Sequence, residues 1–255
     1  MHSPDGDLVR RLRDAGCVFA EEEAALLAAE ARDAGDLARL VARRVAGAPL
    51  EQVLGWAAFA GLRITVAPGV FVPRRRTELL VAEAVVLARP GAVVVDLCCG
   101  TGAVAAALAA AVPDLDLHAA DLDPAAVACA RLNLPVTPVH EGDLFTALPP
   151  GLRGRVDVLT ANVPYVPTAA VALLPPEARQ HEPRTALDGG ADGLALARRV
   201  AAGAPEWLAP GGALLFECGE GQVPAALALV AAAGLAARQV TDDDRGAVVV
   251  VGTRP

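Results

Sequence analysis

The chain has 255 residues, of which 54% are hydrophobic, and this composition supports a sizeable folded core and argues against wholesale disorder. Its formal net charge of −8 argues against a general nucleic-acid-binding surface, although residues 74–76 form a local run of three arginines. Five cysteines without metal-ligand spacing indicate reduced thiols, and the amino terminus lacks a signal-peptide pattern, so we expect a soluble cytoplasmic protein with no bound metal.

Residues 1–48 have the pattern of a small helical domain. Alanine- and leucine-rich runs predict three helices, the second starting at Glu21 and the third capped by Asp36 and ending near Gly47. The pattern indicates no catalytic or binding chemistry. This domain either serves packing alone or docks a macromolecular substrate.

Residues 49–72 change in character and predict a β-hairpin linker. Glycines separate two short apolar stretches, at residues 56–59 and 62–66, as is typical of paired strands. After the linker, Thr77 is in position to start a helix that runs from residue 78 to residue 88.

The rest of the chain, within residues 73–255, alternates apolar strand-like runs with helical runs. The predicted strands are residues 92–97, 115–120, 136–140, 156–161, 213–218, 236–241 and 247–252. The predicted helices between them are residues 103–112, 124–132, 194–204 and 225–233. This alternation predicts an α/β fold with a parallel sheet covered on both faces, whose ligands bind beyond the carboxyl ends of the strands.

A glycine-containing turn, Asp96-Leu-Cys-Cys-Gly100-Thr-Gly102, follows the first strand of this sheet, where glycines let a backbone approach a ligand closely. Asp121 ends the second strand, where its carboxylate can accept bonds from both ribose hydroxyls, and Asp143 follows the third, where it can accept from an adenine amino group. The third glycine of a dinucleotide loop is missing, and Asp96 suits a cationic tail better than a phosphate. These features favour S-adenosyl-L-methionine, whose ammonium and sulfonium groups are positive.

The fourth strand runs into Asn-Val-Pro-Tyr at residues 162–165. Asn162 carries an amide oxygen, and Pro164 favours an extended Val163 whose carbonyl can point outward. Tyr165 adds a flat ring with a polar tip. Two carbonyl oxygens facing one pocket suit a planar –NH2 group, so Asn162, Pro164 and Tyr165 are the candidate catalytic residues. A sulfonium methyl is already activated, so alignment is the main requirement and we assign no general base.

These motifs, in this order, resemble those of the HemK/PrmC-type glutamine N5-methyltransferases. Residues 49–55, residues 73–74 with 77–78, and residues 182–190 resemble that family specifically, and the resemblance covers residues 49–252. It implies a class I, Rossmann-like S-adenosylmethionine-dependent methyltransferase with a seven-stranded mixed sheet. It also implies methylation of the glutamine side chain in the Gly-Gly-Gln loop of peptide chain release factors.

The resemblance assigns roles to individual residues. The Asn162 side chain and the Val163 carbonyl would hold the amide, with Tyr165 packed beside it. Asp121 and Asp143 would hold the adenosine. Other residues implied at the cleft and the cofactor loop are Thr77, Glu78, Asp96, Gly100 and Gly102.

The sequence departs from the family pattern in three places: Val163 stands where the family has proline, Cys98 stands where it has glycine, and Arg75-Arg76 stands where it has Pro-Glu. The acceptor therefore stays open among three alternatives: a release factor, another protein or small molecule, and the exocyclic amino group of adenine in DNA, reached by base flipping onto Tyr165. A non-enzymatic nucleoside-binding module with a decayed site is a further alternative.

Overall fold

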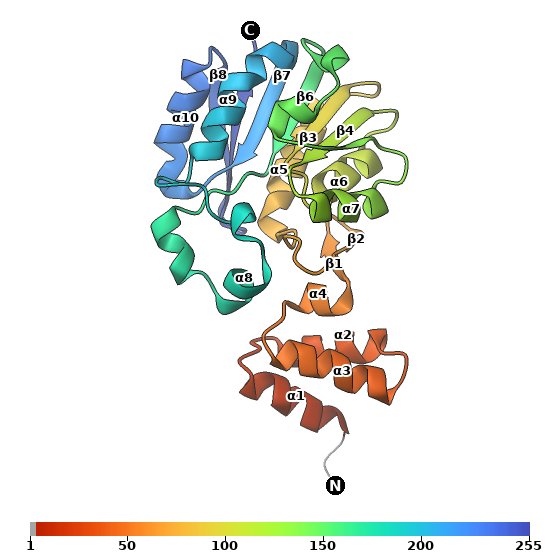
Figure 1. Cartoon of the computed structure of the whole chain (residues 1–255). Coiled ribbons are helices and arrows are strands. Elements are labelled where there is room, and N and C mark those ends of the chain that lie inside the picture. Colours follow the sequence, from red (N-terminus) through yellow and green to blue (C-terminus); the bar gives the residue numbers. More distant parts are fainter. Residues whose placement is uncertain (1–3) are drawn as a thin grey trace.

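The computed structural model describes residues 4–255, so the first three residues of the predicted N-terminal domain lie outside the described part of the chain. The molecule is elongated, with an α/β body that ends at the C-terminus and a group of helices at the opposite end (Figure 1). Within residues 4–255 no helix is long and apolar enough to cross a membrane.

The N-terminal group consists of α1 (Pro4–Asp14), α2 (Ala20–Glu30), α3 (Ala34–Val45) and the short α4 (Leu50–Leu54). Buried leucines and valines from all four helices form its own core, apart from the core of the body. The predicted cap of α3 was wrong: Asp33 is the N-cap, and its carboxylate accepts from the Asp36 backbone N–H at 2.7 Å. Asp36 lies in the first helical turn instead, bonded to Arg32.

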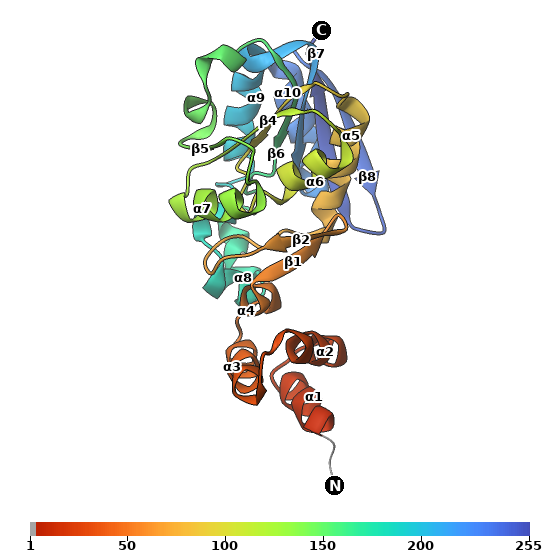
Figure 2. The same cartoon turned by 90° about the vertical axis from the view of Figure 1, so that its right-hand side faces the viewer.

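The predicted hairpin is β1 (Trp56–Phe59) paired antiparallel with β2 (Leu62–Thr65). It lies between the N-terminal helices and the body (Figure 2), and Phe59 and Ile64 pack into the core of the body. The helix α4 was not predicted. The division into residues 1–48, 49–72 and 73–255 stays a prediction, although α4 contributes Val53 to the N-terminal core.

In the described chain the body is built on a seven-stranded mixed sheet of strand order β5-β4-β3-β6-β7-β9-β8, which confirms the expected fold class. The strands are β3 (Val93–Leu97), β4 (Asp116–Asp121), β5 (Val139–Glu141), β6 (Val156–Ala161), β7 (Leu208–Glu217), β8 (Ala236–Asp242) and β9 (Ala247–Thr253). The strands β3 to β7 pair in parallel, and β9 pairs antiparallel with both β7 and β8.

Helices cover both faces of the sheet (Figure 2). They are α5 (Glu78–Leu87), α6 (Ala103–Ala111), α7 (Pro124–Asn133), α9 (Ala195–Trp207) and α10 (Val223–Ala232). The short α8 (Pro176–His181) lies away from the sheet, on the side of the N-terminal helices (Figure 1). Successive strand residues point to opposite faces, so Val95 packs with α9 and α10 while Val94 packs with α5, α6 and α7. Because β3 to β7 pair in parallel, their carboxyl ends all lie at one edge of the sheet.

The predicted elements of the body are present, most of them with shifted ends. The strand β5 is shorter than expected, β7 is longer, and α9 continues through Pro205 to Trp207. The segment between β6 and α9 was not predicted to be structured. It contains α8 and two 3₁₀ turns, Thr168–Leu173 and Arg184–Ala186.

Candidate active site

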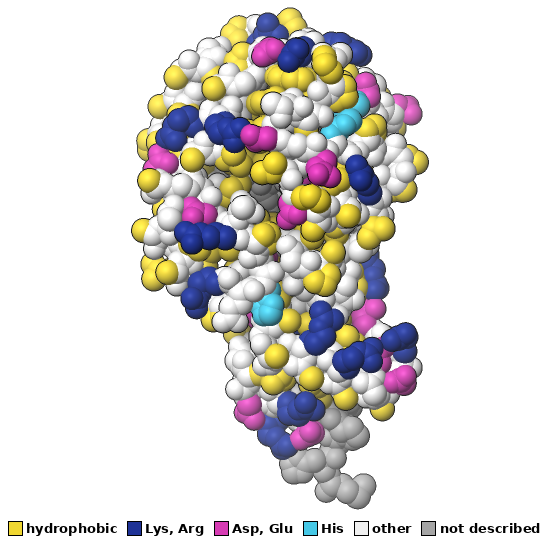
Figure 3. Space-filling model, viewed as in Figure 1, with side chains coloured by type: hydrophobic (Ala, Val, Ile, Leu, Met, Phe, Trp, Pro, Cys, Tyr) yellow, Lys and Arg dark blue, Asp and Glu magenta, His cyan; other side chains and the backbone are white. Residues whose placement is uncertain are grey.

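A cavity of about 840 Å³ lies beyond the carboxyl ends of β3, β4 and β6. It is visible as a hollow in the middle of the face drawn in Figure 3. The sequence-predicted residues in its wall are Thr77, Asp96, Gly100, Asp121, Asp143, Asn162 and Pro164. The strand ends therefore bring most of the predicted site together, as the topology requires.

Asp96, in β3, is 1% exposed and carries an unsatisfied oxygen. Its Oδ1 accepts from the Thr160 hydroxyl at 2.8 Å, while Oδ2 is buried without a hydrogen-bond partner in the described chain. Burial raises the pKa of this carboxyl to about 7, and the Thr160 hydroxyl opposes that rise. A buried, unpaired carboxylate oxygen at a cavity wall suits a cationic ligand group.

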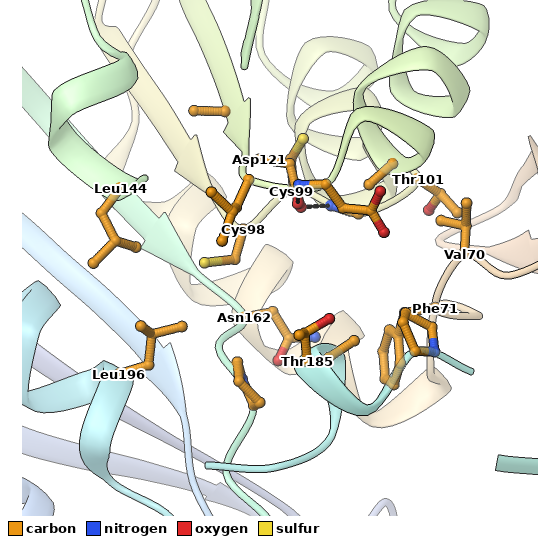
Figure 4. Close-up of a pocket in the computed structure, with 18 of the residues that line it drawn as sticks. Val70, Phe71, Cys98, Cys99, Thr101, Asp121, Leu144, Asn162, Thr185 and Leu196 are labelled. Carbon is orange, nitrogen blue, oxygen red and sulfur yellow. Dashed lines mark hydrogen bonds between the residues drawn. The ribbon is translucent and has the colours of Figure 1, made fainter. Parts of the chain in front are cut away.

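Asp121 ends β4 and holds the turn after β3. Its Oδ2 accepts from the Gly100 N–H at 2.8 Å (the dashed line in Figure 4), and its Oδ1 accepts from the Asp123 N–H at 2.9 Å. Each carboxylate oxygen keeps a second lone pair for a ligand. Burial raises the pKa of Asp121. Gly100 has φ of +55°, and a side chain there would be strained.

The other predicted cofactor residues differ in their surroundings. The Asp143 carboxylate lines the cavity but is paired with Arg199 at 2.7 Å. Gly102 is absent from the wall; it is the N-cap of α6 with φ of +76°, where an added Cβ would lie 2.8 Å from Leu134. The absence of a side chain at Gly102 therefore permits α6 and α7 to pack closely. Cys98 lines the cavity at φ of +55°, a backbone region in which a residue other than glycine is strained.

Asn162 lies across the cavity from Asp121, Cys98 and Cys99 (Figure 4). Its Nδ2 donates to the Thr77 hydroxyl at 3.3 Å, and that hydroxyl donates to Glu217 Oε2 at 2.6 Å. No hydrogen bond within residues 4–255 ends at Asn162 Oδ1 or at the Val163 carbonyl, which leaves both oxygens for a ligand.

A second cavity, of about 300 Å³, lies on the other side of the same segment and is lined by Val163 and Tyr165. Thr77, Asn162 and Pro164 line both cavities. Burial raises the pKa of Tyr165 to about 12, so its phenol stays protonated. The Arg76 guanidinium lies 5.5 Å from the centre of its ring.

Glu78, predicted to border the cleft, lines neither cavity. Its Oε1 accepts from the Ala60 backbone N–H at 3.1 Å, in the turn of the hairpin. It therefore joins the linker to α5, next to a residue, Thr77, that does face the site.

Sequence reasoning missed two side chains that hold the Asn-Val-Pro-Tyr segment, Glu217 and Gln222. Gln222 donates to the Tyr165 carbonyl and to the Asp192 carbonyl, both at 2.9 Å. Glu217 ends the otherwise apolar β7 and is 2% exposed. An acidic residue at the carboxyl end of a buried strand beside β6 was the available signal for it.

The residues present fit S-adenosyl-L-methionine. The cavity has the size of a nucleoside-cofactor site, and its wall offers three strand-end carboxylates, one with a buried unpaired oxygen. Among the described residues no basic cluster for a pyrophosphate lines it, since Arg199 is the one arginine in the wall and pairs with Asp143.

Comparisons with known proteins agree with this geometry. A family model described as the methyltransferase small domain matches residues 61–172. The release factor glutamine methyltransferase of Geobacter sulfurreducens is 40% identical over 220 residues, which cover 84% of this chain and 76% of that protein. The 4-amino-L-phenylalanine/4-methylamino-L-phenylalanine methyltransferase of Streptomyces pristinaespiralis is 39% identical over 203 residues, which cover 76% of this chain and 69% of that protein.

A methyltransferase from Pyrococcus furiosus has a similar solved structure, with a TM-score of 0.58 at 16% identity over 84% of this chain and 96% of that chain. That likeness shows the fold alone. The sequence relatives go further, because identity near 40% extends over more than two thirds of their length. The resemblance seen in the motifs is confirmed: the chain is a methyltransferase that belongs to the release factor glutamine methyltransferase family.

Proposed function

We propose that this chain transfers a methyl group from S-adenosyl-L-methionine to the side-chain amide nitrogen of a glutamine, in the Gly-Gly-Gln loop of a peptide chain release factor. The observation that carries the proposal is the hydrogen bonding of the Asn162 side-chain amide. Its NH2 is held by Thr77, while its oxygen and the Val163 carbonyl are free of partners within the described residues. Two free acceptors on one short segment match the two hydrogens of an amide NH2.

The cofactor would occupy the larger cavity, where it supplies a methyl group on a positively charged sulfur. Asp96 would face its cationic tail, Asp121 would accept from its ribose, and Asp143 would lie at its adenine. Gly100 would allow the close backbone approach. Because bonds from Gly100 and Asp123 already fix Asp121, little ordering of the carboxylate remains to be done on binding.

The acceptor amide would be held by Asn162 and Val163, with the Tyr165 ring packed beside it. An amide nitrogen is a poor nucleophile, because its lone pair is delocalised into the carbonyl. Fixing both N–H bonds sets the direction of that lone pair, and good positioning is worth roughly 7–11 kcal/mol. With the phenol pKa of Tyr165 at about 12, we assign this residue a packing role and no proton transfer.

A protein acceptor is consistent with the second cavity, which reaches the same segment from the side of α8. Asn162 and Pro164 form part of the wall between the two cavities. A side chain from a loop could enter the smaller one while the cofactor fills the larger. We assign the N-terminal helices to docking of that protein, since Arg44 of α3 pairs with Glu177 of α8 and so joins them to this side of the site.

A second candidate acceptor is the aromatic amine of a small amino acid. The similarity to the Streptomyces pristinaespiralis enzyme favours it, because the compounds in the name of that relative carry an aryl amino group, another planar nitrogen. The same two oxygens would accept from that amine.

The test is to incubate the protein with tritiated-methyl cofactor and, separately, a release factor, 4-amino-L-phenylalanine and duplex DNA. We expect label in the release factor, and peptide mass spectrometry should place one methyl group on the glutamine of the Gly-Gly-Gln loop. A release factor with alanine in place of that glutamine is the matched control. Transfer to the free amino acid or to DNA, with none to the release factor, would contradict the proposal.

A further inference from the structure

Thr77 lies between two side chains that are far apart in the sequence. Its hydroxyl donates to Glu217 Oε2 at 2.6 Å and accepts from Asn162 Nδ2 at 3.3 Å. Thr77 and Glu217 are each 2% exposed, so bulk water does not compete for these bonds. The short bond to the carboxylate is the stronger of the two, because one partner carries charge.

The direction of these bonds follows from what each group can donate. A carboxylate only accepts, so the one hydrogen of the Thr77 hydroxyl is committed to Glu217. Thr77 then has only a lone pair to offer Asn162. Asn162 must turn its NH2 toward Thr77, and its oxygen is left facing away from that bond.

We propose that Thr77 and Glu217 are positioning residues that set the orientation of the Asn162 amide, so that an oxygen and not an NH2 is presented to the acceptor. This inference rests on the proposed function for its consequence, because an acceptor –NH2 needs an oxygen opposite it. The orientation itself follows from the bonds alone. Neither Thr77 nor Glu217 has to touch the acceptor.

Arg76 determines what happens when the charge on Glu217 is removed. Burial raises the pKa of Glu217, and the Thr77 hydroxyl and the Arg76 guanidinium oppose that rise and favour the carboxylate form. The Nε of Arg76 lies 3.8 Å from Glu217 Oε1, so it also favours an oxygen at that place. In Glu217→Gln the new amide keeps its oxygen toward Arg76 and presents its NH2 to Thr77. Thr77 then donates to Asn162, which turns its oxygen to Thr77 and its NH2 to the acceptor.

The kinetic test compares Glu217→Gln, Thr77→Val and Thr77→Ser with the wild type, using a release factor as acceptor. We expect kcat to fall about tenfold or more in Glu217→Gln and Thr77→Val, while the Kd of the cofactor stays at the wild-type value. Thr77→Ser keeps the hydroxyl and should retain kcat. Matched controls are Glu83→Gln, in a surface pair with Arg238, and Thr241→Val, on the exposed face of β8.

The orientation can also be read without any acceptor. The chain has only two asparagines, Asn133 and Asn162, so ¹⁵N-asparagine labelling gives two side-chain amide signals. Asn133 Nδ2 donates to the carbonyls of Thr65 and Thr101 and serves as the internal reference. In Glu217→Gln we expect the Asn162 NH2 signals to shift and to exchange faster with water, with the Asn133 signals unchanged.

The two readouts separate the inference from the proposed function. If the wild type methylates no release factor but the Asn162 signals respond as stated, the function fails and the positioning role stands. Unchanged Asn162 signals together with wild-type kcat in Glu217→Gln would overturn the positioning role whatever the acceptor. Circular dichroism checks folding, and if Glu217→Gln does not fold, the Thr77→Val and Thr77→Ser pair decides the matter.

Discussion

Asp96→Asn should weaken cofactor binding and stabilise the cofactor-free protein. The carboxyl is 1% exposed, one of its oxygens has no hydrogen-bond partner in the described chain, and burial raises its pKa from 3.8 to about 7. Because the folded pKa lies above the unfolded one, this group favours folding while it is protonated, and that contribution is lost as pH rises through about 7. Asparagine does not ionise and keeps the contribution at every pH.

The size of the effect follows from the pKa difference. The rise from 3.8 to about 7 corresponds to an upper limit of roughly 4 kcal/mol at 1.36 kcal/mol per pKa unit. Above pH 8 the cofactor-free Asp96→Asn protein should therefore unfold at higher denaturant concentration than the wild type. The Thr160 hydroxyl can still donate to the asparagine oxygen, so that bond survives the change. At pH 4 the two proteins should have similar stability.

Cofactor affinity should change in the opposite direction. A cationic group gains from Asp96 only when the carboxyl is ionised, so with a pKa of about 7 the wild-type Kd should be about tenfold weaker at pH 6 than at pH 8. Isothermal titration calorimetry across that range measures it, and Asp96→Asn reports the titration of the cofactor itself. If the cofactor Kd depended on pH identically in the two proteins, the reasoning would be refuted. A variant no more stable than the wild type above pH 8 would also refute it.

Four further substitutions test the site. Asn162→Ala should leave the cofactor Kd nearly unchanged and lower methyl transfer about a hundredfold or more, measured with tritiated methyl; full turnover would refute the assignment. Asp121→Ala removes the acceptor for two backbone N–H groups and should weaken cofactor binding about tenfold or more by calorimetry. Cys98→Gly relieves a backbone at φ of +55° and should raise the free energy of unfolding by up to about 1 kcal/mol in denaturant titration. Gly189→Ala would place a Cβ 2.6 Å from the Pro164 carbonyl oxygen and should lower kcat about tenfold or more, with wild-type turnover counting against the rigidity of the segment.

The sequence predicted the sheet well because each strand of the body is a buried apolar run. The run at residues 156–161 is β6 residue for residue, and the strand ends carry Asp96, Asp121 and Asn162 to one edge. Short elements were not predicted from the sequence, and the reason is physical. The helix α8 has six residues bounded by prolines, and a helix of that length depends on tertiary packing more than on its own sequence. The cap of α3 was misassigned because two aspartates, Asp33 and Asp36, stand three residues apart at its start.

The parts of the site that escaped prediction are those made by contacts distant in sequence. Thr77 and Glu217 are separated by 140 positions, and Tyr165 and Gln222 by 57. No spacing rule links such pairs, whereas Asp96 and Asp121 could be linked because they end successive strands of one βαβ unit. For Glu78 the resemblance implied a place at the cleft beside Thr77, but its carboxylate accepts from the hairpin backbone, whereas the Thr77 hydroxyl bonds to Glu217.

The valine at position 163 is best understood through these distant contacts. Proline at this position would hold the backbone by its own ring, and Val163 gives up that restraint. In its place, Val163 is 1% exposed in the core, and the backbone of Gly189 packs against the Pro164 carbonyl so closely that no Cβ fits between them. Gln222 holds the Tyr165 carbonyl. On the other side of Val163, the Asn162 side chain is bonded to Thr77. Other elements therefore hold the segment before and after Val163, so the two acceptor oxygens keep their places without the ring.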